Sequence, residues 1–333
     1  MFLGTPDAAV GPLRALHEAG FDIALVVTRP DKRRGRGAAL LPSPVKAAAV
    51  ELGLPVSHRV DDVIEAGAEL GVVVAFGQLI KPHVLAAVPM VNMHFSLLPR
   101  WRGAAPVERA ILAGDGETGV CLMELEAGLD TGPVLGRRVV AIGPDETAAE
   151  LRPRLTAVGT DLLLSQLRDG LSPGVAQEGE ATYAPKIDPA ELRLDWTEPA
   201  AQLHRVVRVG RAWTTFRGRR LAVVRSAVVD QDEAVVAGGA PGDRRGAVTG
   251  RVGSGDAMAA GAAPGNRRGA VTADAGSGET VAGGAPGEMR GVVVATGDGE
   301  LELVEVQPEG RAPMGARAWV NGARPRPGER LGS

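Results

Sequence analysis

The chain has 333 residues, 44% of them apolar and 23% charged, and its formal net charge is −3. This balance is typical of a soluble globular protein, and the length allows two domains with separate cores. The net charge excludes a global positive field, and Cys121, as the only cysteine, excludes an intrachain disulfide. Since there is neither a long apolar run nor a signal-peptide pattern, we expect a cytoplasmic protein with no membrane contact.

The first half of the chain alternates short apolar segments with helical patterns. Residues 8–20 have helical spacing and end at a glycine. The segment 21–27 is strand-like, and the nearly continuous apolar run at 71–77 is typical of a parallel strand covered on both faces. A capping box at 147–150 predicts a long helix that ends at Gly170. This alternation predicts an α/β fold with a doubly wound, mostly parallel sheet.

The second half has a different pattern. Residues 171–190 form a polar connection, and a helical pattern follows at 199–210. Residues 214–229 have the pattern of paired strands, and residues 291–306 that of a hairpin turning at Gly-Asp-Gly. Several short strands with turn signals predict a small β-barrel. We therefore expect a catalytic domain at 1–175, a linker at 176–190 and a second domain at 191–333.

A repeated segment interrupts the second domain. Near-copies of one motif rich in Gly, Ala and Arg begin at residues 238, 261 and 283. No Leu, Ile or aromatic residue occurs from Ala234 to Arg290, although a packed repeat would need such side chains. We therefore expect residues 234–284 to be a disordered, low-complexity insertion, and only the third copy to lead into a strand.

The run VNMHFS has a period of two, which is typical of a strand with two different faces. It places Asn92, His94 and Ser96 on one face, where donors from Asn92 and His94 can converge on one point. The motif GLDTG places Asp130 in a glycine-flanked turn. A histidine on a strand is more often structural, and an acid in such a turn is usually only a turn residue. Together, however, the Asn, His and Asp could stabilise an oxyanion and move a proton in acyl transfer.

Other kinds of chemistry have weaker support. Ser96 and His94 could suggest a hydrolase triad, but Ser96 does not lie in a GxSxG elbow. The histidines and the cysteine show no HxxxH or CxxC spacing, so no metal site is expected. The segments GTPD and RGRGAAL lack the complete glycine-rich patterns of nucleotide-binding loops, and we therefore expect no nucleotide cofactor.

Two segments are strongly basic. Residues 29–37 have the sequence RPDKRRGRG, and residues 204–225 carry seven arginines and no acid. One such segment alone could be a solvated face. Two segments, one in each half of the chain, favour a polyanionic partner such as nucleic acid.

The segment NMHFSLLPRWRGAAP at 92–106, together with GLDTGPVL at 128–135, resembles the folate-dependent formyltransferases. The RWRGAAP part is similar in particular to the branch that formylates methionyl-tRNA. Further similarity follows in order along nearly the whole chain, in GTPD, GRGAALLPSPVK, VVAFGQLIKP and ATYAPKI. The resemblance implies a Rossmann-like catalytic domain and a C-terminal OB-like β-barrel domain.

The resemblance also implies roles for individual residues. The catalytic residues of the family fall on Asn92, His94 and Asp130. The folate contacts fall on Ser96, Leu97, Leu98 and Pro99, and the tRNA contacts fall on the loop 32–41, with Arg33, Arg34 and Arg36. The co-substrate is then 10-formyltetrahydrofolate, with no metal, and the partner of an expected monomer is initiator methionyl-tRNA. Because relatives usually have a few more residues before MFLGTPD, we expect a short first strand.

Three alternatives remain at this point. A sister formyltransferase that acts on a sugar nucleotide or on glycinamide ribonucleotide would share the catalytic residues but would not need the basic segments. A 10-formyltetrahydrofolate hydrolase would use water and release formate without an acceptor. A non-catalytic RNA-binding module would leave the combination of Asn, His and Asp unexplained.

Overall fold

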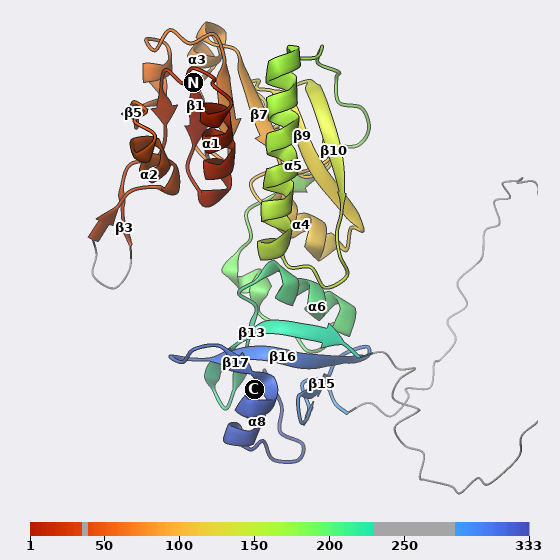
Figure 1. The fold of residues 1–333 in the computed structure, drawn as a ribbon. Helices are drawn as coiled ribbons and strands as arrows, with labels where there is room; N and C mark the ends of the chain where they lie inside the picture. The colour runs from red at the N-terminus through yellow and green to blue at the C-terminus, as the bar shows by residue number, and fades with distance from the viewer. Residues whose placement is uncertain (35–38, 230–283, 333) are drawn as a thin grey trace, which may run out of the picture.

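The computed structural model describes residues 1–34, 39–229 and 284–332. Figure 1 shows two bodies, one above the other, with the N-terminal body coloured from red to light green and the C-terminal body from green to blue. Arg36 lies outside the described residues, and so does the expected insertion, apart from its last residue.

The N-terminal body is built on a seven-stranded sheet. Its strands, in spatial order, are β10 (Val134–Ala141), β9 (Glu117–Glu124), β7 (Met90–His94), β6 (Gly71–Val74), β1 (Phe2–Gly4), β2 (Val26–Val27) and β5 (Val56–Ser57). The five strands from β7 to β5 are parallel, whereas β9 runs antiparallel to both of its neighbours. The mostly parallel sheet is therefore confirmed.

One predicted strand is shorter than its pattern. Residues 21–27 were expected to be extended, but only Val26–Val27 forms a strand. The neighbouring strand β1 begins opposite this point, with Phe2 beside Val26. The Leu25 carbonyl still accepts a hydrogen bond of 2.9 Å from the Phe2 N–H, and the regular pairing starts at Val26.

Helices cover both faces of the sheet, as a doubly wound fold requires. One face, which carries Val91 and Met93, packs against four helices: α1 (Val10–Glu18), α2 (Pro44–Glu51), α4 (Pro106–Ala113) and α5 (Ala148–Asp169). A short 3-10 helix, η1 (Asp7–Ala9), leads into α1. The opposite face, which carries Met90, packs against the 3-10 helix η2 (Val60–Val63) and α3 (Pro82–Ala87).

The long helix α5 begins as its sequence predicts. The Thr147 hydroxyl accepts a hydrogen bond from the Glu150 N–H, and the Glu150 carboxylate accepts one from the Thr147 N–H. This capping box satisfies donors that the first helical turn leaves unpaired. Gly170, with a φ of 88°, ends the helix. The capping box and the helix end are both confirmed.

The C-terminal body contains one antiparallel sheet, which confirms a separate β domain where the sequence predicted an OB-like β-barrel. Its strands are β12 (Trp213–Phe216), β13 (Arg219–Val228), β16 (Glu300–Pro308), β15 (Val293–Ala295) and β14 (Met289–Arg290), with β17 (Met314–Gly315) beside β16. The expected hairpins form between β12 and β13 and between β15 and β16. The 3-10 helix η3 (Pro189–Leu192) and the helices α6 (Ala200–Val209) and α8 (Ala316–Ala323) complete the body. Its core includes Trp196, Leu203, Leu221, Leu301 and Trp319.

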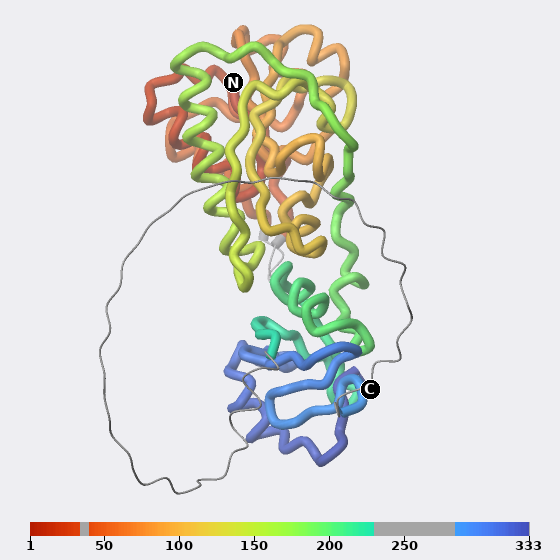
Figure 2. Tube along the Cα trace, turned by 90° about the vertical axis from the view of Figure 1, so that its right-hand side faces the viewer, coloured from red at the N-terminus to blue at the C-terminus, as the bar shows by residue number. Residues whose placement is uncertain are grey.

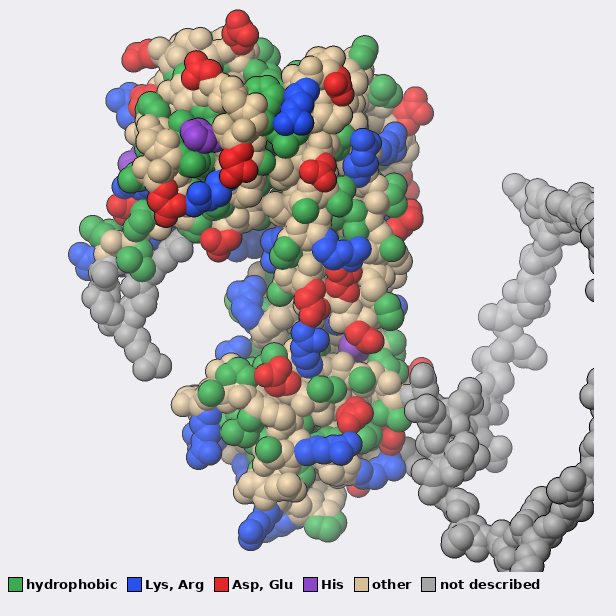
Figure 3. Space-filling view, viewed as in Figure 1, with side chains coloured by type: hydrophobic (Ala, Val, Ile, Leu, Met, Phe, Trp, Pro, Cys, Tyr) green, Lys and Arg blue, Asp and Glu red, His purple; other side chains and the backbone are tan. Residues whose placement is uncertain are grey.

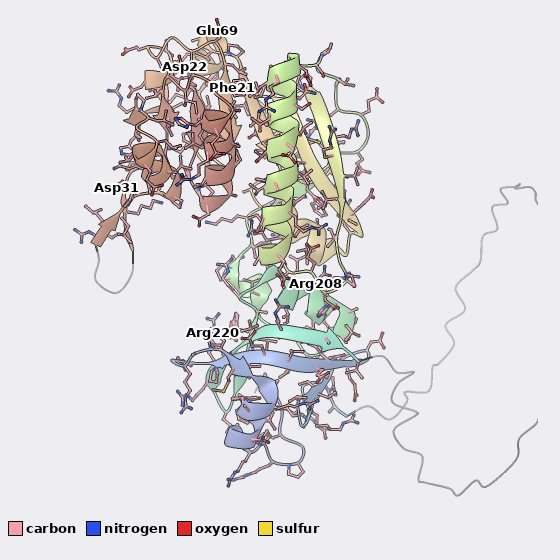
Figure 4. All side chains as sticks on the ribbon, in the orientation of Figure 1. Phe21, Asp22, Asp31, Glu69, Arg208 and Arg220 are labelled. Carbon is pink, nitrogen blue, oxygen red and sulfur yellow. The ribbon has the colours of Figure 1, made fainter. Side chains whose placement is uncertain are left out.

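Polar contacts join the two bodies at α6. The guanidinium of the buried Arg208 donates to the carbonyls of Gly143 and Glu146 at 2.8 and 2.9 Å. His204, also buried, lies 3.0 Å from Asp145 through Nε2. Figure 4 labels Arg208 at this boundary. The loop that precedes α5 is thus held by one face of α6.

The connection between the bodies packs against the N-terminal body. Figure 2 shows it running from the end of α5 down the outside of that body to the C-terminal one. Along the way, β11 (Tyr183–Ala184) pairs in parallel with β8 (Arg102–Gly103), and Val175 forms a bridge with Val134. The expected linker therefore contains regular structure, while the exact domain boundaries remain a prediction. Within the ranges that the structure describes, every helix is too short or too polar to span a bilayer.

Candidate active site

His94 ends β7 and Asn92 lies two residues before it, at the edge where the parallel neighbour of β7, β6, also ends. β7 is paired with β6 on one side and with β9 on the other, so its position is fixed by two ladders. As residues i and i+2 of a strand, Asn92 and His94 point to the same face. Asn92 is half-buried, and His94 is buried with 6% of its side chain exposed. In open α/β sheets, this edge is where ligands bind.

The loop after β7 determines the orientation of the His94 ring. The Ser96 hydroxyl donates to the Arg100 carbonyl at 2.6 Å, and the peptide bond between Leu98 and Pro99 is cis. The loop thereby brings the Trp101 carbonyl to within 2.9 Å of His94 Nε2. Because a carbonyl can only accept, Nε2 carries the hydrogen and Nδ1 of the neutral ring is an acceptor.

Asp130 faces the other nitrogen of the ring. Its Oδ2 lies 3.6 Å from His94 Nδ1, which is longer than a hydrogen bond. The same oxygen accepts a hydrogen bond of 2.8 Å from the Gly103 N–H, and only 12% of the Asp130 side chain is exposed. The backbone of Asp130 is left-handed, with a φ of 51°, which is uncommon for a residue other than glycine. The structure therefore brings together all three residues predicted to be catalytic.

The wall behind His94 is apolar. Cys121 lies opposite His94 on β9, and Met123 lies opposite Asn92. Both are fully buried and pack with Leu98. Burial raises the pKa of the Cys121 thiol, which therefore stays protonated at neutral pH. An apolar wall strengthens the electrostatic interactions of the polar groups that it borders.

The side chains of the segment predicted to contact folate differ in how deeply they are buried. Ser96 and Leu98 are buried within the loop, whereas Leu97 and Pro99 are half-buried. The sequence interpretation did not select two exposed leucines, Leu79 after β6 and Leu129 after β9, beside Asp130. Both follow strands next to β7, so the strand order could have identified them.

The basic loop predicted to contact tRNA forms a two-stranded ribbon. Lys32–Arg34 (β3) pairs antiparallel with Ala39–Leu41 (β4), and Arg33 is exposed. Figure 1 shows this ribbon projecting downward from the lower left of the N-terminal body. At its base, Asp31 binds Lys46 at 2.7 Å.

The second basic segment is only partly available to a ligand. Arg208 is held by backbone carbonyls, Arg217 pairs with Glu329, and Arg225 pairs with Glu150. Arg219 remains exposed, and Arg220 stacks on the Trp213 ring at 4.4 Å from its centroid. Across the part of the chain that the structure describes, no group of three or more His, Cys, Asp or Glu side chains is placed to hold a metal ion.

Comparisons with known proteins cover both bodies. Residues 1–167 match a family model described as formyl transferase, and residues 186–258 and 262–324 match the formyl transferase C-terminal domain. The methionyl-tRNA formyltransferase of Symbiobacterium thermophilum is 40% identical over 349 residues, which covers 99% of this chain and 94% of that protein. That of Halorhodospira halophila is 40% identical over 343 residues, with 99% and 97% covered.

Solved structures show the same fold at low sequence identity. A sugar 3N-formyl transferase in the presence of dTDP and 5-N-formyl-THF has a TM-score of 0.60 at 14% identity and covers 93% of this chain and 97% of its own. HypX from Aquifex aeolicus in complex with tetrahydrofolic acid has a TM-score of 0.52 at 15% identity, and the match covers 81% of this chain and 43% of that one.

Proposed function

The chain belongs to the folate-dependent formyl transferase family as a methionyl-tRNA formyltransferase, and on this premise we propose that Asn92, His94 and Asp130 carry out the transfer. The observation that carries the assignment is the fixed arrangement around His94. One ring nitrogen is held by the Trp101 carbonyl, and the other faces a carboxylate that is itself held by the Gly103 N–H. Of the alternatives left open by the sequence motifs, the full-length similarity selects the methionyl-tRNA branch.

The acceptor is the α-amino group of methionyl-tRNA, and the formyl donor is 10-formyltetrahydrofolate. An α-amino group has a pKa of about 7.7–8.0, so a useful fraction is neutral and nucleophilic at pH 7. Its nitrogen attacks the formyl carbon, and the carbonyl oxygen becomes an oxyanion. In this proposal the Asn92 amide donates a hydrogen bond to this oxyanion, which stabilises the tetrahedral intermediate.

His94 and Asp130 handle the proton. In the neutral ring, Nδ1 is an acceptor, and its 3.6 Å separation from Asp130 leaves it open to a reacting group. Nδ1 takes up the proton that the attacking amine loses. Asp130 stabilises the resulting imidazolium, which returns the proton to N10 of the folate as the C–N bond to the formyl group breaks.

The folate is proposed to lie against the loop at 96–99 and the exposed side chains of Leu79 and Leu129. A flat pterin ring buries apolar surface, and these exposed leucines, which follow the strands on either side of β7, offer such surface. Ser96 and Leu98 would then act mainly by shaping the loop, because both are already buried.

The tRNA is proposed to lie along the side from which the β3–β4 ribbon projects. Figure 3 shows a hollow on this side, with Lys and Arg side chains along its inner and lower border. Figure 4 places Arg220 on the same side as Asp31 at the base of the ribbon. In the C-terminal body, Arg219, Arg220 and Arg311 are among the residues that line a pocket of about 400 Å³. Such contacts would hold the phosphate backbone and position the acceptor end.

The direct test is to incubate the protein with 10-formyltetrahydrofolate and initiator tRNA charged with methionine. We expect formyl-methionyl-tRNA, and no formate release when the charged tRNA is left out. Formate release without an acceptor would instead show a hydrolase. Since both the catalytic residues and the basic surfaces come from one chain and the substrate is tRNA, we further propose a monomer that acts in the cytoplasm.

A further inference from the structure

Gln177 joins two segments of the candidate active site from outside it. Its Nε2 donates to the carbonyls of Asp130 and Gly132, at 2.9 and 2.8 Å. Its Oε1 accepts from the Arg102 guanidinium, from Nε at 3.1 Å and from Nη2 at 2.7 Å. The nitrogen and the oxygen of one side-chain amide therefore bond two different segments of the candidate active site.

The surroundings of Gln177 show that these contacts are specific. From residue 173 to residue 180, every residue except Gln177 is exposed. The segment is anchored before Gln177, where Val175 bridges Val134, and after it, where Thr182 binds the Trp101 N–H at 2.9 Å. Between these two anchors, Gln177 is the side chain that reaches inward.

The contacts close a ring around Asp130. The Asp130 carboxylate accepts a hydrogen bond from the Gly103 N–H. The residue before Gly103 is Arg102, and its guanidinium donates to the Gln177 side chain. Gln177 in turn holds the backbone carbonyl of Asp130. Because Asp130 has a left-handed backbone, its turn needs outside support to keep this conformation. The two donated hydrogen bonds of Gln177 supply that support at the turn itself.

We infer that Gln177 is a positioning residue for Asp130, and that the linker segment thereby forms part of the catalytic framework. The inference rests on the proposed role of Asp130. Because the Gln177 amide bonds the backbone of the Asp130 turn and the Arg102 side chain, its loss should act on the chemical step through Asp130. A displacement of Asp130 by about 1 Å can lower turnover by as much as about 100-fold.

The test compares two replacements of Gln177 with a matched control. Gln177→Leu removes every hydrogen bond of the amide. Gln177→Glu keeps an acceptor for Arg102 but loses the donors to the two carbonyls. The control is Gln166→Leu, because the Gln166 amide also uses both of its ends, but on Ser172 and not on the Asp130 turn. For each variant, kcat, the KM for methionyl-tRNA and the melting temperature are measured.

We expect both Gln177 variants to lower kcat by about 10- to 100-fold, with little change in KM, and the control to stay within about threefold of the parent. A Gln177→Glu variant with normal kcat would overturn the inference, since the contact to Arg102 alone would then suffice. A raised KM with unchanged kcat would also overturn it, by making the linker a substrate-binding surface. Asp130→Ala with normal kcat would instead refute the proposed role of Asp130.

Discussion

Gly103→Ala tests the position of Asp130 from the opposite side of the site. Gly103 has a φ of 125°, and its N–H donates to Asp130 Oδ2 at 2.8 Å. An added Cβ would lie 2.8 Å from the Ala184 carbonyl oxygen, whereas ordinary contact begins at 3.4 Å. The strands β8 and β11 must therefore separate by about 0.6 Å, the difference between these two distances.

The size of the effect follows from this movement. If Gly103 moves by the full amount directly away from Asp130, the distance from its nitrogen to Asp130 Oδ2 rises from 2.8 Å to about 3.4 Å, beyond the usual limit of about 3.2 Å. A hydrogen bond to a charged group contributes about 1.5–3 kcal/mol, and about 1.4 kcal/mol corresponds to a factor of ten in rate. We therefore expect formyl transfer to slow by about 10- to 100-fold.

The assay is single-turnover formylation at saturating methionyl-tRNA, together with urea unfolding. The control is Gly20→Ala, because Gly20 also has a positive φ, of 82°, but no atom lies within 4 Å of an added Cβ. Each variant should lose about 1–3 kcal/mol of unfolding free energy from backbone strain. Only Gly103→Ala should lose rate. Equal rates in the two variants would refute the argument that this hydrogen bond holds Asp130.

Two further predictions concern the outer surface and the boundary between the bodies. Replacing Arg33 and Arg34 with Ala should weaken tRNA binding and make it less dependent on salt. The slope of log affinity against log salt concentration should fall by about 0.7–0.9 for each lost phosphate contact. An unchanged slope would show that the ribbon does not touch tRNA. Burial lowers the pKa of His204, although Asp145 opposes the shift, so the unfolded chain binds the proton more readily. The free energy of unfolding should therefore fall as the pH drops below about 6.5, and His204→Gln should reduce this fall; an identical pH dependence in both proteins would contradict it.

The sequence predicted the parts of the site that follow a local rule. The period of two in β7 placed Asn92 and His94 on one face, and the capping box at Thr147 predicted where α5 begins. These patterns depend on backbone geometry within a few residues, and for this reason they can be recognised without the fold.

Features that depend on distant contacts were not predictable in this way. Gln177 lies in a polar segment with no periodicity, and its role depends on Asp130 and Arg102, which are 47 and 75 residues away. The number of arginines in the segment 204–225 that are available to a ligand was overestimated. Arg225, for example, pairs with Glu150 in the other body.

The most direct test of the account is single-turnover formylation by Asn92→Ala, with Asn321→Ala on the exposed surface of α8 as the matched control. Because Asn92 is proposed to donate to the oxyanion, its loss should lower the rate by about 10²–10³-fold while tRNA affinity stays the same. Asn321→Ala should transfer the formyl group at the parental rate. An Asn92→Ala enzyme whose rate stays within about threefold of the parent would contradict the assignment of this face of β7 as the reaction site.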